Sequence, residues 1–146
     1  MDTTISKPSL TLKRQLKAAP EKVYQAWTQP EQMTLWWGVT PHANKPIAES
    51  DLRVGGRFRV QFWSPDGERH SVSGIYREVV PNRRLVFTWS WQSTPERESQ
   101  VTIDIKPVNE GSLLTLLHEQ FFDQKACDDH GRGWGMALDR LEALFA

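Results

Sequence analysis

Apolar and polar residues alternate with a period of two over most of the chain, the pattern of strands that bury one face. This pattern predicts strands at residues 10–16, 47–52, 57–62, 70–80, 85–91, 101–105 and 114–118. The alternation is most regular over residues 85–91, which include Phe87, Trp89 and Trp91. Short connections join the later strands, and residues 64–67 have the composition of a type I turn. Neighbouring strands are therefore expected to be antiparallel.

The apolar spacing changes to the helical period of about 3.6 in three places. Pro20 and Pro30 each stand where a first helical residue tolerates proline, so two short helices are expected, the second ending at Gly38. A loop follows over residues 40–46. After Phe122 the helical spacing runs to the end of the chain, with Asp123 as the predicted N-cap.

The long last helix must bury its apolar face, and the sheet is the only large partner for it. The elements thus predict an α+β fold, with one helix laid across antiparallel strands. We expect a single domain over residues 10–146, preceded by a disordered or extended tail over residues 1–9.

Charge and composition remove several classes of partner. Lys and Arg number 18, and Asp and Glu also number 18, so the formal net charge is +0 and no nucleic-acid partner is expected. The polar start and the lack of a long apolar run predict a cytoplasmic protein with no membrane attachment. Cys127 is the single cysteine and cannot form an internal disulfide.

Seven tryptophans in 146 residues predict an interior lined by large flat side chains. Pattern alone favours a filled aromatic core, and a partly filled interior that encloses a bulky apolar ligand is the alternative. The candidate ligand-binding residues are Trp36, Trp37, Phe58, Phe62, Tyr76, Phe87, Trp89, Trp91, His118 and Trp134. Trp36 and Trp37 stand beside a proline-bearing loop, so we expect one to pack inward and the other to line an entrance.

Two of these residues carry polar groups with two interpretations each. His118 lies on the same strand face as Leu114 and Leu116, which directs the imidazole inward. A hydrogen-bonded core histidine is the simpler interpretation, and a ligand contact or general base is the alternative. The hydroxyl of Tyr76 likewise needs a partner, which the protein or a ligand could provide.

Two clusters in the last helix suggest more specific chemistry. Cys127 and His130 are three residues apart, but a zinc site needs three or four ligands and a nucleophile pair needs an oxyanion hole, so we assign neither a metal nor a catalytic residue. Gly131, Gly133 and Gly135 interrupt a helix instead of following a strand, so no dinucleotide fingerprint and no cofactor are expected. A close backbone approach to sheet or ligand, or a local bend, would explain them.

Several short motifs resemble a known family when they are taken in order along the chain. They are Trp36-Trp37-Gly38, Arg53-Val54-Gly55-Gly56-Arg57-Phe58, Gly74-Ile75-Tyr76-Arg77-Glu78-Val79-Val80-Pro81, Leu85-Val86-Phe87-Thr88-Trp89 and Gly133-Trp134. From Leu10 to Phe145 the chain is similar to the Hsp90-ATPase-activator-homologue-like branch of the START/Bet v 1-like (SRPBCC) superfamily. The resemblance implies a helix-grip fold, in which a curved sheet wraps the terminal helix and leaves a cavity between them.

The resemblance also implies a function for this cavity. Family members bind hydrophobic small molecules, some relatives carry out cyclase-type chemistry, and the eukaryotic namesake stimulates a chaperone ATPase. We therefore expect binding of a hydrophobic, aromatic ligand. A cyclase or hydrolase with His118 as acid/base and a chaperone-interacting module are the alternatives. The family shares no single catalytic set, and this chain departs from it where Val39 and Thr40 separate Pro41 from the Trp-Trp-Gly motif.

The sheet face that points away from the last helix is relevant to self-association. It carries Ile75, Val79, Val86, Leu113 and Leu117 among polar residues. A contiguous apolar patch would favour a homodimer, whereas scattered exposed apolar side chains are normal. Both interpretations stay open at this point.

Overall fold

The computed structural model describes residues 7–37 and 45–146. Its strands are β1 (Leu10–Leu16), β2 (Ile47–Ser50), β3 (Arg57–Trp63), β4 (Arg69–Val80), β5 (Arg84–Trp91), β6 (Ser99–Val108) and β7 (Gly111–Glu119). Its helices are α1 (Pro20–Thr28), α2 (Pro30–Trp36) and α3 (Gln124–Leu144). The predicted tail up to residue 6, the helix end at Gly38 and the loop up to residue 44 lie outside the described residues.

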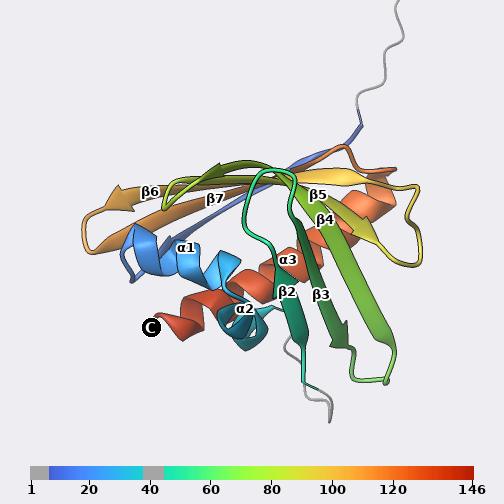
Figure 1. Cartoon of the computed structure of the whole chain (residues 1–146), viewed down its shortest axis with the longest axis horizontal. Coiled ribbons are helices and arrows are strands. Elements are labelled where there is room, and N and C mark those ends of the chain that lie inside the picture. The colour runs from blue at the N-terminus through green and yellow to red at the C-terminus, as the bar shows by residue number, and fades with distance from the viewer. Residues whose placement is uncertain (1–6, 38–44) are drawn as a thin grey trace, which may run out of the picture.

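The seven strands form one antiparallel sheet in the order β1-β7-β6-β5-β4-β3-β2. From β2 to β7 each strand pairs with the next one along the chain, as the short connections predict. β1 instead pairs with β7, with Leu10 opposite His118. Figure 1 shows the sheet arching over α3, with α1 and α2 on the same side of the sheet. The predicted α+β, helix-grip architecture is confirmed.

The helices begin where the sequence chemistry predicts. Pro20 and Pro30 are the first residues of α1 and α2, where the missing N–H costs no hydrogen bond. Asp123 caps α3, since its carboxylate accepts the backbone N–H of Ala126 at 2.8 Å. The face of α3 that meets the sheet buries Trp134, Ala137, Leu138 and Leu141. Burial of this stripe, together with the cap, holds α3 against the sheet.

A bulge in β4 helps to curve the sheet. The register of β4 against β5 shifts between Tyr76 and Glu78, and a bulge of this kind bends and twists its strand. Next to it, a Cβ on Gly74 would stand 1.8 Å from the carbonyl oxygen of Thr88, so only glycine allows this approach. The N–H of Ile75 finds its acceptor in the Thr88 hydroxyl, at 2.8 Å. The missing side chain of Gly74 and the hydroxyl of Thr88 therefore both support the bend in β4.

The outer sheet face is mixed in exposure. Ile75 is 39% exposed, whereas Val86 is buried at 8%, and Leu113 and Leu117 are half-buried. The prediction was wrong for Val79, which packs against the core opposite Leu85, because the register shift in β4 turns its side chain to the inner face. The homodimer stays a prediction. None of the described helices has the length and apolar character needed to cross a membrane.

Candidate functional site

A cavity of about 500 Å³ lies between strands β3 to β5 and helix α3. Its lining residues are Trp37, Phe62, His70, Trp89, Trp91, Ser93, Thr94, Asp129, His130, Gly133, Trp134, Met136, Ala137 and Arg140. We refer to it as the tryptophan cavity. Sites that bind drug-sized molecules enclose roughly 300 to 1,000 Å³ and are lined mainly by apolar and aromatic side chains. The tryptophan cavity meets both conditions.

Five of the ten predicted ligand-binding residues meet in this lining. They are Trp37, Phe62, Trp89, Trp91 and Trp134. Trp37 stacks on Trp89, with ring centroids 5.6 Å apart and planes at 8°. The ring of Trp134 is 5.0 Å from that of Trp89, and the ring of Phe62 is 6.0 Å from that of Trp91. The rings form a continuous aromatic wall that reaches from the end of α2 to the sheet and to α3.

Trp36 and Trp37 take different positions although they are adjacent. Trp36 is fully buried, and its indole N–H donates to the carbonyl of Ala26 at 2.9 Å. Trp37 is 4% exposed and lines the cavity. Trp36 thus packs between α1 and α2, and Trp37 is part of the cavity lining.

Three further predicted residues form a solid aromatic group beside the cavity. Phe58, Tyr76 and Phe87 are each 2% exposed, and the rings of Phe58 and Phe87 meet edge to face at 5.0 Å. The Tyr76 hydroxyl shares a hydrogen bond of 2.8 Å with Ser50, and burial raises the pKa of Tyr76. The Tyr76 hydroxyl thus has its partner within the protein, and the group fills the space between β3, β4 and β5.

His118 is also outside the lining, and both of its ring nitrogens are occupied. The indole N–H of Trp134 donates to Nδ1 at 2.9 Å, so the proton is on Nε2, which donates to the hydroxyl of Ser99 at 2.7 Å. Burial, with a smaller contribution from the nearby His130, lowers the pKa of His118 to about 2. His118 is therefore a neutral imidazole with no free nitrogen.

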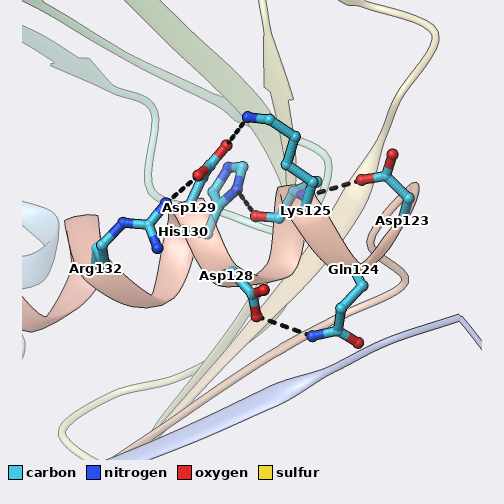
Figure 2. Close-up of polar contacts among 8 residues, drawn as sticks. Asp123, Gln124, Lys125, Asp128, Asp129, His130 and Arg132 are labelled. Atoms are coloured by element: carbon cyan, nitrogen blue, oxygen red, sulfur yellow. Dashed lines mark hydrogen bonds and ion pairs between the residues drawn. The ribbon is translucent and has the colours of Figure 1, made fainter.

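His130 is held in the opposite tautomer. Its Nδ1–H donates to the carbonyl of Ala126 at 2.7 Å, a contact visible in Figure 2. Its Nε2 then accepts the indole N–H groups of Trp91 at 2.8 Å and Trp89 at 3.2 Å. Burial lowers the pKa of His130, while the bond to Ala126 and the charge of Asp129 act in the other direction.

These two histidines accept all three indole N–H groups that the sheet and α3 contribute to the cavity, those of Trp89, Trp91 and Trp134. The N–H groups are consequently committed to the protein. The aromatic wall therefore borders the cavity with apolar ring surface and without a free indole N–H from these three residues.

Sequence reasoning missed several lining residues on α3. His130, Gly133, Ala137 and Arg140 recur at helical spacing on the face that Trp134 marks, and this periodicity is the signal that could have found them. His70 was missed too, although it stands directly opposite Phe62 in the register of β3 and β4.

The glycines of α3 do not mark a tight backbone contact. A Cβ on Gly133 or Gly135 would meet no atom within 4 Å, and one on Gly131 would stand at an ordinary 3.7 Å from Leu10. Close approach to the sheet is therefore not their explanation. Gly133 lines the cavity, so the missing side chain leaves open space beside Trp134.

The polar residues at the start of α3 pair with one another, as Figure 2 shows. Asp129 binds Lys125 at 2.8 Å and also Arg132, and Asp128 accepts from Gln124 at 2.9 Å. The bond from Lys125 is the largest influence that lowers the pKa of Asp129. The carboxylates of Asp128 and Asp129 are thus paired with other side chains of α3.

Cys127 and His130 do not face each other. The thiol of Cys127 donates to the carbonyl of Ser9 at 3.6 Å, whereas His130 faces the tryptophans. Across residues 7–37 and 45–146, no group of three or more His, Cys, Asp or Glu side chains is arranged to hold a metal ion.

Several solved structures have the same fold as this chain. A protein from Chromobacterium violaceum, CV1439, is 28% identical, with a TM-score of 0.81 over 94% of this chain and 96% of that one. A protein from Rhizobium leguminosarum is 25% identical, with a TM-score of 0.79 over 94% and 93% of the two chains. CalU16 from Micromonospora echinospora is 27% identical, with a TM-score of 0.71 over 94% and 76%.

No curated protein matches the sequence. The family model described as "Activator of Hsp90 ATPase homolog 1-like protein" matches residues 17–146, which is most of the chain. This match and the shared fold confirm the resemblance that the sequence motifs indicated. The chain belongs to the Activator of Hsp90 ATPase homolog 1-like family.

Proposed function

We propose that this protein binds a hydrophobic, ring-containing small molecule in the tryptophan cavity. The observation that carries the proposal is the cavity of about 500 Å³ between the sheet and α3, with four tryptophans and a phenylalanine in its lining. Its volume suits a ligand of two to several fused rings.

Burial of ring surface supplies the affinity in this proposal. Each Å² of apolar surface removed from water contributes roughly 25 cal/mol, and aromatic pairs add to this when their rings stack or meet edge to face. Trp37 and Trp89 already stack on each other, so the wall is rigid before a ligand arrives. A rigid wall lowers the entropic cost of binding. The hydroxyl groups of Ser93 and Thr94, which are also in the lining, add polar contacts.

The chemistry of the lining favours binding over catalysis. The nitrogens of His130 are bound to Ala126 and the tryptophans, and Nε2 of His70 is bound to Ser64 at 3.1 Å. Asp129 is paired with two cations. A general acid or base must reach the proton that it transfers. Among the described lining residues, each imidazole and carboxylate already has a partner within the protein.

A matched pair of glycine variants tests the proposal. Gly133→Leu fills the cavity without a backbone clash, whereas Gly135→Leu makes the same change one position beyond Trp134, outside the lining. The measurement is intrinsic tryptophan fluorescence during titration with neutral aromatic probes, 2-naphthamide and a flavonoid.

We expect a saturable fluorescence change in wild type and in Gly135→Leu, and at least about tenfold weaker binding in Gly133→Leu, since the added side chain occupies the ligand volume. Absence of saturable binding in the wild type would contradict the proposal. Equal affinity in wild type and Gly133→Leu would contradict it as well, because the probe would then bind elsewhere.

A further inference from the structure

The tryptophan cavity contains two ionised side chains, Asp129 and Arg140, and both come from α3. They are 11 residues apart, which is close to three full turns, so they lie on the same helix face with about 16 Å between them along the axis. One end of the cavity therefore carries a negatively charged side chain and the other end a positively charged one.

The two charges differ in how they are balanced. Asp129 is bound by Lys125 and Arg132, both on the same helix, as Figure 2 shows. Arg140 makes no ion pair and no hydrogen bond through its side chain within the part of the chain that the structure describes. The negative end of the cavity is neutralised by the protein, and the positive end is not.

The carboxylates closest to Arg140 in sequence are directed elsewhere. Asp139 and Glu142 both bind Arg14 on β1, at 2.5 and 3.5 Å. Arg140 as a whole is half-buried, and its side chain is part of the cavity lining. A guanidinium carries five N–H donors in a planar fork that matches the two oxygens of a carboxylate.

We infer that the ligand of the tryptophan cavity is an aromatic acid, whose rings lie against Trp37 and Trp134 while its carboxylate binds the guanidinium of Arg140. This inference rests on the proposed function and adds the charge of the ligand to it. The same arrangement excludes ligands that carry an amine at that end, because a second cation would face Arg140 without a counter-ion.

The test compares two probes of the same shape, 2-naphthoate, which is ionised at neutral pH, and neutral 2-naphthamide. Affinities are measured by tryptophan fluorescence and by calorimetry with wild type, Arg140→Gln, Arg140→Lys and Arg83→Gln. Arg83 is an exposed residue in the turn between β4 and β5, so its replacement makes the same charge change far from the lining.

We expect wild type and Arg83→Gln to bind naphthoate about tenfold more tightly than naphthamide, a difference typical of a charged hydrogen bond near solvent. Arg140→Gln should bind both probes equally, at the affinity of naphthamide. Arg140→Lys should keep part of the preference, because the ammonium retains the charge without the planar fork. Added salt should weaken binding of naphthoate and leave that of naphthamide unchanged.

The outcomes separate this inference from the proposed function. If wild type binds both probes equally, or if the preference for naphthoate survives in Arg140→Gln, the inference is overturned and the proposed function stands. If wild type binds neither probe, both are overturned. Loss of both probes in Gly133→Leu shows that the compared affinities refer to the tryptophan cavity.

Discussion

Trp134 on α3 donates its indole N–H to Nδ1 of His118 on β7 at 2.9 Å, and both side chains are almost completely buried. The bond joins the terminal helix to the sheet at a point that water does not reach. It also sets the tautomer of His118 and thereby the direction of its second bond, to Ser99. Together with the buried apolar stripe of α3, this contact fixes how the helix is rotated against the sheet.

Trp134→Phe is expected to destabilise the protein more than Trp27→Phe. Loss of the indole leaves Nδ1 of His118 without a donor, and an unsatisfied buried acceptor costs about 1 to 3 kcal/mol beyond lost packing. The indole N–H of Trp27 is buried and has no hydrogen-bond partner in the described structure, so its removal breaks no bond. Urea unfolding of both variants checks this, and equal losses would contradict it.

Stability is expected to fall as the pH is lowered below about 6.5, because the pKa of His118 is 6.5 when unfolded and about 2 when folded. Between these values the unfolded chain binds a proton that the folded protein does not. The free energy of unfolding should therefore drop by up to about 1.4 kcal/mol per pH unit. The lowered pKa of His130 acts in the same direction.

Urea unfolding at intervals from about pH 4.5 to 6.5 measures this slope, above the range where carboxylates such as Asp129 lose their contribution. His118→Gln should reduce the slope, and His118→Asn provides a second variant. High salt should leave it unchanged, because burial rather than ion pairing is the main cause of the shift. A slope identical in wild type and both variants would contradict the assignment.

Periodicity predicted most of the fold because it is a local property of the chain. The alternation around Trp89 located β5, and the prolines and Asp123 located the helix starts. The pairing of β1 with β7 was not predicted, because no residue of β1 encodes which strand lies beside it. Register and partner are decided by the whole sheet.

The candidate site was predicted only in part, for a related reason. Alternation shows that Phe87 and Trp89 point to one face, but not that Phe87 fills the core while Trp89 reaches the cavity. The pairing of the tryptophans with His118 and His130 depends on how α3 docks, which is a tertiary property. Gly133 has no side chain that could indicate a role from the sequence. Only the structure shows that the space beside it is open.

Gly135→Ala is expected to stabilise the protein by up to about 1 kcal/mol, and Gly133→Ala by a similar amount. Alanine restricts the unfolded chain and favours the helix, and neither position brings the new methyl group near another atom. Gly74→Ala is the contrasting variant, since its Cβ would overlap the Thr88 carbonyl, and it should destabilise strongly. Thermal unfolding of the three variants checks the order, and a stable Gly74→Ala would contradict it.

Thr88→Val is expected to cost about 1 to 3 kcal/mol of stability, although the two side chains have nearly the same shape. The change removes the hydroxyl that accepts the N–H of Ile75 at the bulge, and Thr88 is 4% exposed, so water cannot easily replace it. Thr88→Ser keeps the hydroxyl and should retain most of the stability. A loss as large in Thr88→Ser as in Thr88→Val would show that packing, not the hydrogen bond, is responsible.

The pairing of Leu10 with His118 has a consequence for how the protein is made. During synthesis β1 leaves the ribosome roughly a hundred residues before its partner β7, so it cannot pair with that strand until most of the chain has been made. Until then its backbone groups and apolar face are open to aggregation. Contacts so distant in sequence also slow folding, because a long loop must close before they form. We therefore expect completion of the sheet at β1 to be a late and slow folding event.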